Sequence, residues 1–151
     1  MKVAIASDHA GFEFKQELVK QLTEGGYDVI DLGTTTADIP DDYPDHAVDV
    51  ANAILRKQAE RGILICGSAV GVSIGANKFK GIRAGVCHDS YSAHQSVEHD
   101  DVNILCLGQR VIGINLAVEI AFIFLKAIYS GLPRHQRRLE KIFAIEDKNM
   151  K

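Results

Sequence analysis

Short apolar runs alternate along the chain with longer segments of helical period. Five such runs, each nearly continuously apolar, occupy residues 3–6, 29–32, 62–66, 83–87 and 102–107. Strands that helices cover on both faces have uninterrupted apolar sequences, whereas half-exposed strands alternate apolar with polar residues. The runs therefore predict five buried parallel strands.

The segments between these runs have the period of amphipathic helices. Apolar residues recur at helical spacing over 14–22 and 47–55, and Gly25-Gly26 ends the first segment. An almost all-round apolar helix is predicted over 115–129 and a basic, mostly solvated one over 134–147. The alternation predicts an α/β fold: a single doubly wound, Rossmann-like domain spanning 1–151, with a five-stranded parallel sheet and helices on both faces.

Composition and charge exclude several classes of protein. The 151 residues suit one domain, and 46% hydrophobic with 25% charged residues is ordinary for a soluble globular chain. The formal charge of -3 provides no basic surface, so we expect no nucleic-acid partner. The longest apolar stretch, 112–128, is interrupted by Asn115, Glu119 and Lys126, so we expect a buried helix and no membrane partner.

The cysteines and the N-terminal residues indicate a compartment. The three cysteines, Cys66, Cys87 and Cys106, lie far apart and form no CxxC motif, which favours a reducing environment. The apolar run at the N-terminus is too short for a signal peptide and meets Asp8 and His9 at once. We therefore expect a cytoplasmic protein.

Reactive residues gather directly after the predicted strands. The segments 7–11, 66–71, 88–90 and 108–110 follow the first, third, fourth and fifth strands and contain Asp, His, Cys, Ser and Arg. Ligands of doubly wound sheets bind in the crevice beyond the carboxyl ends of the strands. The function is expected along that edge.

The Gly-rich loop after the third strand is the strongest local signal. Its glycines, Gly67 and Gly71, would let backbone N–H groups turn inward at a helix N-terminus and hold an anion, or would serve only a tight turn. The loop matches neither GxGxxG nor the P-loop pattern, so no dinucleotide is expected. Cys66, beside that helix N-terminus, is placed to act as a thiolate base or nucleophile, or is a small buried hydrophobe like Cys87 and Cys106.

Histidines and arginines supply further candidates. His9, His88 and His99 are expected near the crevice, where each is a possible proton donor, whereas histidines 46, 94 and 135 fall in helical contexts that are usually solvated. Arg134 and Arg138, at i and i+4, either clamp a phosphate or form a solvated basic face.

Five motifs together resemble ribose-5-phosphate isomerase type B over essentially the whole chain. They are Ser7-Asp8-His9-Ala10-Gly11, Asp42-Tyr43-Pro44, Cys66 to Lys78 (CGSAVGVSIGANK), Gly81-Ile82-Arg83-Ala84 and Arg134-His135-Gln136-Arg137-Arg138. The resemblance extends to the wider group that includes galactose-6-phosphate and allose-6-phosphate isomerases.

The resemblance implies an aldose–ketose isomerisation through a cis-enediolate, with no metal and no cofactor. It also implies a phosphosugar substrate and a homodimer or dimer of dimers whose active sites lie between two subunits. On this basis Cys66 is the base that moves a proton between C2 and C1, and His99 is the acid that opens the furanose ring.

The remaining site residues follow from the same resemblance. The backbone of the 67–71 loop, with the Ser68 hydroxyl, would stabilise the enediolate oxygen. Asp8 and Tyr43 would bind sugar hydroxyls or help to open the ring, and His9 and three arginines would hold the 5-phosphate. The expected substrate-binding set is Asp8, His9, Tyr43, Gly67, Ser68, Ala69, Val70, Gly71, Asp100, Arg110, Arg134 and Arg138.

The chain departs from the resemblance at three positions. Ala69 stands where many members have Gly, Ser68 where many have Thr, and Asp100 where well-known members have Asn. A Cβ at position 69 narrows the loop or requires a different backbone conformation, and a carboxylate at position 100 repels an anion unless it turns toward a hydroxyl or an arginine.

Three alternatives stay open at this point. The substrate could be a 6-phosphohexose, because one extra hydroxymethylene alters the length of the pocket and not the mechanism. Ala69 and Asp100 motivate a non-catalytic phosphosugar-binding module. A metal-dependent hydrolase would use His9, His88 and His99, although these histidines lack a recognisable ligand spacing.

Overall fold

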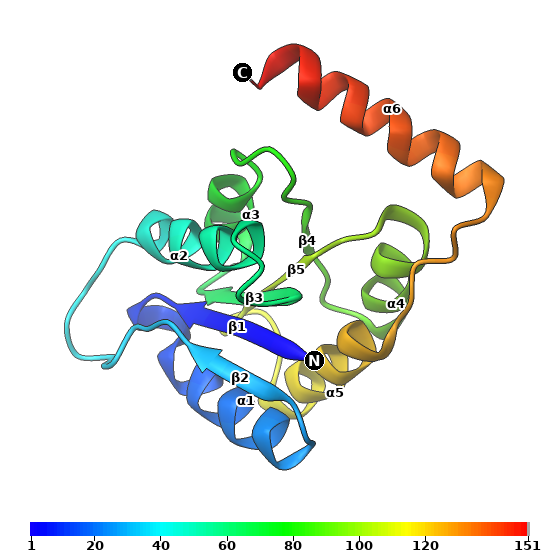
Figure 1. The fold of residues 1–151 in the computed structure, drawn as a ribbon. Coiled ribbons are helices and arrows are strands. Elements are labelled where there is room, and N and C mark those ends of the chain that lie inside the picture. Colours follow the sequence, from blue (N-terminus) through cyan, green and yellow to red (C-terminus); the bar gives the residue numbers. More distant parts are fainter. Residues whose placement is uncertain (151) are drawn as a thin grey trace.

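The structure, a computed structural model, describes residues 1–150 and contains one five-stranded parallel sheet (Figure 1). The strands are β1 (Lys2–Ser7), β2 (Asp28–Asp31), β3 (Arg61–Cys66), β4 (Ala84–Val86) and β5 (Ile104–Gly108), in the order β2-β1-β3-β5-β4. This arrangement confirms the predicted α/β fold class. Strand β4 is shorter than predicted, and β5 begins two residues later than expected.

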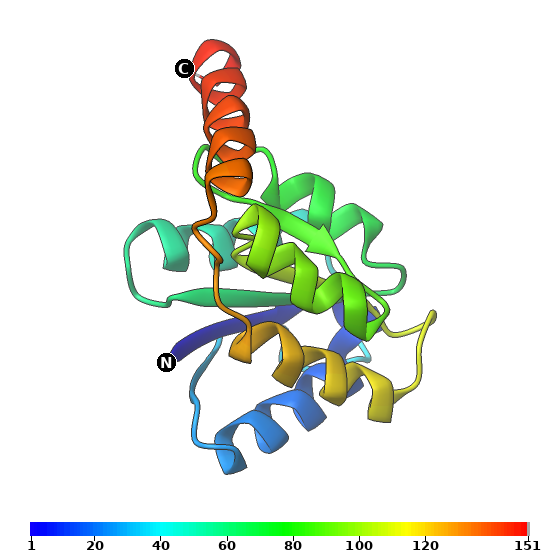
Figure 2. The ribbon, with the colours of Figure 1, turned by 90° about the vertical axis from the view of Figure 1, so that its right-hand side faces the viewer.

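Helices cover both faces of the sheet (Figures 1 and 2). They are η1 (His9–Gly11), α1 (Phe12–Glu24), α2 (Tyr43–Leu55), α3 (Val70–Ala76), α4 (Ser90–Asp100), α5 (Ile114–Lys126) and α6 (Pro133–Asn149). Helices α1, α4 and α5 pack with one face of the sheet in one apolar cluster, whereas α2 and α3 pack on the other face in a second cluster. No helix within residues 1–150 is long and apolar enough to cross a membrane.

The burial of the strands differs between the centre and the edges of the sheet. Strands β1, β3 and β5 are almost entirely buried, as predicted. The prediction is wrong for β2 and β4, whose residues are partly or fully exposed, because each of these strands lies at an edge with one neighbour only.

Helix α5 ends earlier than the apolar pattern predicts. The pattern runs to residue 129, but the helix stops at Lys126 and the backbone of Ala127 is extended. The Arg61 guanidinium donates hydrogen bonds to the carbonyls of Phe124 and Ala127. A cation that satisfies the last carbonyls of a helix stabilises its C-terminal end.

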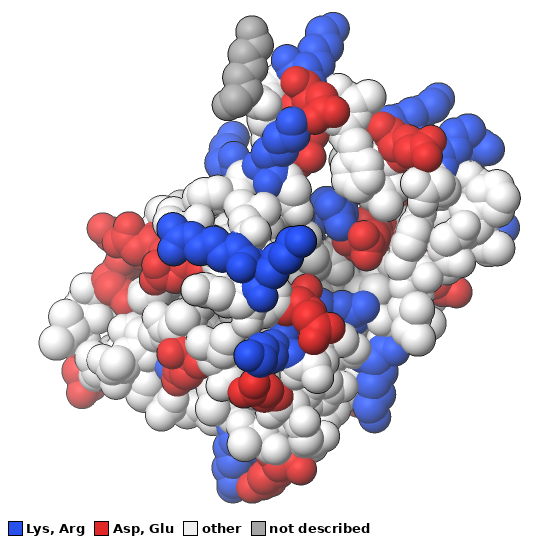
Figure 3. Space-filling view, in the orientation of Figure 1, with Lys and Arg blue, Asp and Glu red and all other residues white. Residues whose placement is uncertain are grey.

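Helix α4 returns the chain from the carboxyl ends of the strands, the carboxyl edge of the sheet, to their amino ends, the amino edge. It starts just after the carboxyl end of β4 and ends four residues before the amino end of β5. After α5, the chain leads into α6, which extends away from the sheet (Figures 1 and 2) and carries both basic and acidic side chains (Figure 3). The first turn of α6 contacts the end of α4, where His135 meets His99.

Candidate active site

A cavity of about 330 Å³ lies at the carboxyl edge of the sheet, where the sequence predicts the site. Residues that follow β1, β3 and β5 line it together with the first residue of α2. The lining residues are Asp8, His9, Ala10, Tyr43, Cys66, Gly67, Ser68, Gly71, Arg110 and Val111. Ala10 and Val111 are not among the residues expected from the sequence.

Cys66 is the last residue of β3, and its thiol faces a backbone donor. The N–H of Ala69 donates to Sγ at 3.1 Å, and the side chain is 5% exposed. A backbone N–H aimed at sulfur is a group that stabilises a thiolate. Cys66 and Cys106 belong to one apolar cluster and Cys87 to the other, and burial raises the pKa of the Cys87 and Cys106 thiols. Of the three cysteines, only Cys66 lines the cavity.

The loop after Cys66 includes one residue, Ala69, in a left-handed backbone conformation that favours glycine. Ala69, fully buried, has φ +73° and caps the N-terminus of α3, so its Cβ is tolerated in the left-handed conformation at a cost of about 1 kcal/mol. At Gly71, a Cβ would lie 2.7 Å from Cζ of Tyr43, and at Gly108 it would lie 2.8 Å from the carbonyl carbon of Ser68. These two glycines therefore let the walls of the cavity approach each other.

Asp8 serves both the backbone and the cavity. Its Oδ1 accepts hydrogen bonds from the N–H groups of Ala10 at 3.0 Å and Gly11 at 3.1 Å, which caps η1. Within residues 1–150, Oδ2 has no hydrogen-bond partner, so it is the oxygen available to a ligand. The Asp8 side chain is thus held in one orientation while it lines the cavity.

Two residues that the sequence analysis did not select support His9. Oδ1 of Asp41 lies 3.1 Å from His9 Nδ1, and Oδ2 lies 2.7 Å from His46 Nε2. The expectation that His46 is solvated is wrong, because its side chain is 12% exposed. Burial alone would raise the pKa of Asp41, but hydrogen bonds from His46 and from the backbone and ring of His9 lower it to about 2.

His99 lies far from the cavity of its own chain. Helix α4 has 11 residues, a length of about 16 Å, and it carries His99 and Asp100 to the amino edge of the sheet. Cys66 lies at the carboxyl edge, so the expectation that His99 borders the crevice is wrong within one chain. Arg134 and Arg138, exposed near the start of α6, lie near His135, which stacks on His99, and neither lines the cavity.

His135 is a second histidine whose environment differs from the expectation. It was expected to be solvated, but it is 2% exposed and its ring stacks on His99. Burial lowers the pKa of His135, and the neighbouring His99, Arg134 and Arg138 lower it further. The sequence motif RHQRR, residues 134–138, marked this segment as a candidate part of the site. It did not indicate which of its side chains is buried.

His88 has a structural partner. Its Nε2 accepts a hydrogen bond from the N–H of Gly108 at 2.9 Å, and burial lowers its pKa. The three histidines of the hydrolase alternative are therefore not brought together in one chain: His88 is bonded to the backbone and His99 is at the other edge. Within residues 1–150, we find no group of three or more His, Cys, Asp or Glu side chains arranged to hold a metal ion.

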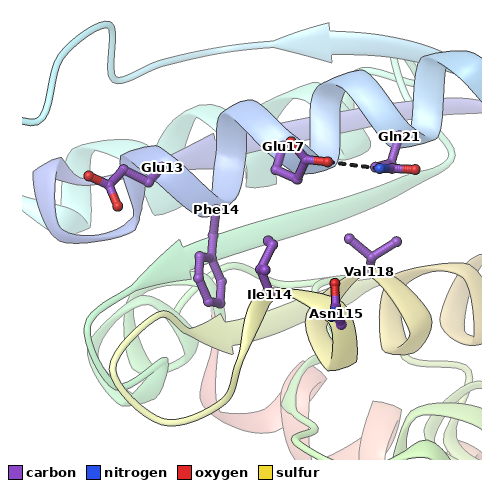
Figure 4. Close-up of a pocket in the computed structure, with 7 residues that line it drawn as sticks. All are labelled: Glu13, Phe14, Glu17, Gln21, Ile114, Asn115 and Val118. Carbon is purple, nitrogen blue, oxygen red and sulfur yellow. Dashed lines mark hydrogen bonds between the residues drawn. The ribbon is translucent and has the colours of Figure 1, made fainter.

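A second cavity, of about 380 Å³, lies between α1 and α5 (Figure 4). Its lining residues are Glu13, Phe14, Glu17, Gln21, Ile114, Asn115 and Val118. None of them is a Cys, His, Lys or Arg, and Glu17 accepts a hydrogen bond from Gln21 at 2.8 Å. The cavity at the carboxyl edge of the sheet, which combines a thiol, an imidazole and a guanidinium, is therefore the better candidate.

Comparison with known proteins agrees with the resemblance seen in the sequence. Residues 3–142 match the family described as Ribose/Galactose Isomerase. Ribose-5-phosphate isomerase B of Escherichia coli K12 is 49% identical over 147 residues, 97% of each chain. Ribose-5-phosphate isomerase B of Clostridium thermocellum is 49% identical, with a TM-score of 0.95 over 98% of this chain and 99% of that one.

A third relative has been solved with a bound sugar phosphate. Ribose-5-phosphate isomerase B of Mycoplasma genitalium, crystallised with ribulose-5-phosphate, is 39% identical and has a TM-score of 0.92. The match covers 98% of this chain and 97% of that one.

Proposed function

The chain belongs to the ribose/galactose isomerase family, and we propose that it interconverts D-ribose 5-phosphate and D-ribulose 5-phosphate. It is a sugar-phosphate aldose–ketose isomerase, as its relatives are. The main support for a sugar-phosphate substrate is the cavity that Cys66, His9 and Arg110 line together. The relative with bound ribulose-5-phosphate, which shares this fold over nearly its whole length, supports that choice.

In the proposed reaction, the Cys66 thiolate removes the proton from C2 of the open-chain aldose. The electrons of the C–H bond form the C1–C2 double bond, and O1 takes the negative charge of a cis-enediolate. The hydroxyl proton of O2 then moves to O1, the thiol of Cys66 donates its proton to C1, and O2 becomes the carbonyl oxygen of the ketose. The base is a group of the chain, and it returns one proton for each proton that it removes, after exchange with solvent. The proposed steps therefore use no metal or cofactor.

The loop that follows Cys66 is suited to stabilise the enediolate. Its backbone N–H groups, from Gly67 to Gly71, lie at the N-terminus of α3, and the Ser68 hydroxyl borders the same cavity. Fixed donors aimed at a developing oxyanion contribute about 3 kcal/mol to lowering a barrier. In this proposal Asp8 and Tyr43 bind sugar hydroxyls, and His9 and Arg110 bind the phosphate.

A second copy of the chain completes the site in this proposal. His99 would enter the cavity from the partner as the acid that opens the furanose ring, accompanied by Asp100, Arg134 and Arg138. Exposed apolar side chains on α3 and α6 support such an assembly: Val70, Ile74, Ile142 and Ile145 are 42–63% exposed. We therefore propose a homodimer, or a dimer of dimers, with shared sites.

Deuterium exchange tests the proposed reaction. We expect the wild type to incorporate deuterium from D₂O into ribose 5-phosphate and to form ribulose 5-phosphate, as followed by NMR in the presence of a chelator. In Cys66→Ala both signals should disappear while the sugar still binds. Isomerisation by Cys66→Ala at the wild-type rate would exclude the thiolate as base, and loss of wild-type activity with chelator would exclude the metal-free mechanism.

A 6-phosphohexose is the second candidate substrate, because the family description includes galactose. The ratio of kcat/KM for ribose 5-phosphate to kcat/KM for allose and galactose 6-phosphates separates the two. We expect the pentose to be preferred, and a preference for a hexose would overturn the assignment.

A cytoplasmic location is part of the same proposal. All three cysteines are free, and the metabolic substrate is a phosphorylated sugar.

A further inference from the structure

We propose that Asp41 and His46 act together as positioning residues that hold His9 as a donor to the phosphate of the substrate. This inference rests on the proposed function in one respect, the identity of the anion as a sugar phosphate. Asp41 lies between β2 and α2, directly before the N-cap of α2, and its carboxylate bridges η1 and α2.

The contacts of Asp41 fix both the backbone and the ring of His9. Oδ1 accepts the backbone N–H of His9 at 2.7 Å and lies 3.1 Å from its Nδ1. The backbone N–H of Asp41 also lies 3.2 Å from the same Nδ1. Since His9 lines the cavity and Nδ1 is engaged on the Asp41 side, Nε2 is the ring nitrogen available to a ligand.

This arrangement suits His9 in more than one protonation state. When the ring is neutral and protonated on Nε2, Nδ1 accepts from the Asp41 N–H. When Nδ1 is protonated, it donates to Oδ1 of Asp41. In both arrangements Nε2 is the ring atom that faces the cavity, and the carboxylate of Asp41 lies on the opposite side of the ring.

His46 orients the carboxylate of Asp41. Its Nε2 lies 2.7 Å from Oδ2, and its Nδ1 is buried without a partner among residues 1–150. A buried N–H without an acceptor costs more than a bare ring nitrogen, so the proton lies on Nε2 and is donated to Asp41. The nearby hydroxyl of Thr34 also lowers the pKa of Asp41, by less than the two histidines do. With these donors, the pKa of Asp41 is about 2, so the carboxylate is charged at neutral pH.

The other groups that line the cavity explain why this support matters. Asp8 brings a carboxylate, Cys66 a thiol and Tyr43 a phenol, and Arg110 is the one permanent cation among the ten lining residues. A second positive donor beside Arg110 has to come from His9 or from a partner chain. Loss of the charge on Asp41 should therefore weaken the binding of a phosphate.

The test compares Asp41→Asn with Asp38→Asn, which removes the same charge from the same loop. Asp38 is exposed and its side chain makes no contact with His9. For Asp41→Asn we expect KM for ribose 5-phosphate to rise about tenfold with kcat changed by less than about threefold. The Kd for inorganic phosphate, measured directly, should rise by a similar factor. Asp38→Asn should behave as the wild type in both measurements.

Imidazole ¹⁵N spectra give a readout that a merely structural contact would not move. In the wild type we expect His46 as the Nε2–H tautomer and a shift of the His9 nitrogens on addition of phosphate. In Asp41→Asn the His9 response should be reduced. A wild type in which His46 carries its proton on Nδ1, or an Asp41→Asn protein with the KM and phosphate affinity of Asp38→Asn, would overturn the inference.

The test separates this inference from the proposed function. If the wild type fails to isomerise ribose 5-phosphate, the proposed function fails, whereas phosphate binding and the ¹⁵N spectra still decide the contribution of Asp41. If Asp41→Asn does not fold, the tautomer of His46 and the response of His9 in the wild type decide it alone.

Discussion

The imidazole ring of His135 stacks on that of His99, with centroids 4.0 Å apart and an interplanar angle of 26°. His135 is buried and its Nδ1 contacts the Ser130 hydroxyl, so the ring is held between α6 and the end of α4. Gln95, one turn earlier on α4, lies 3.1 Å from Nδ1 of His99. These contacts leave His99 little freedom to rotate.

Replacing His135 should therefore affect both the stability and the acid step. For His135→Ala we expect a loss of about 1–3 kcal/mol in the free energy of unfolding, measured with urea, because a buried ring is removed. We also expect kcat to fall. His135→Phe keeps the stacked ring and is the matched control. If the Phe variant loses as much activity as the Ala variant, the stack is not what positions His99.

Mixing two inactive variants should restore activity if the sites are shared. Cys66→Ala and His99→Asn are each expected to be inactive. Half of the dimers in an equal, fully exchanged mixture pair the two chains, and one of their two sites is intact, so about a quarter of wild-type activity should return. A mixture that stays inactive after complete exchange of subunits would show that Cys66 and His99 do not act in a common intersubunit site.

Adding a methyl group at Gly71 should displace Tyr43. The new Cβ would lie 2.7 Å from Cζ of the Tyr43 ring, closer than real contacts allow. We expect Gly71→Ala to cost about 1–3 kcal/mol of stability and to raise KM for ribose 5-phosphate. Gly113→Ala is the control, since nothing lies within 4 Å of its Cβ position. An unchanged KM in Gly71→Ala would remove Tyr43 from the proposed binding set.

Lowering the pH should destabilise the folded chain through protonation of Asp41. Its pKa is about 2 in the folded chain, against an ordinary value of 3.8. As the pH falls below 3.8, the Asp41 carboxylate becomes protonated in the unfolded chain but stays charged in the folded chain until about pH 2. The free energy of unfolding therefore decreases between these two pH values. Urea titrations at pH 4.5 and 3.0 should show a larger loss for the wild type than for Asp41→Asn. Equal losses would mean that the pKa of Asp41 is not lowered.

The sequence allowed the sheet and one half of the site to be predicted, because both depend on local patterns. Apolar runs identify buried strands, and Asp8, Cys66 and Arg110 each lie at the carboxyl end of a strand or within two residues of it. The departure at Ala69 was also visible in the sequence, and the structure shows that this residue adopts the left-handed conformation with its Cβ in place.

The other half of the site depends on the direction in which helix α4 runs and on contacts between residues far apart in the sequence. Helix α4 runs from the carboxyl ends of the strands to their amino ends, so His99, near its C-terminus, lies far from the cavity. No local pattern in the sequence marks this direction. The contact of His9 with Asp41 joins residues 32 positions apart through a loop that has no periodic pattern. That loop contains Asp38, Asp41 and Asp42, and nothing in its sequence indicates which of these carboxylates contacts His9.

The position of His99 at the edge opposite Cys66 also bears on inhibition. Strand β5 alone spans about 16 Å, and no side-chain rotation closes such a distance. In a shared site, a compound that keeps two chains apart would stop the reaction without entering the polar sugar-phosphate cavity. A peptide that imitates α6 and competes with the second chain would be such a compound. Because the proposed site takes residues from both chains, substrate would favour the assembled form, so the peptide should act most strongly at low substrate concentration.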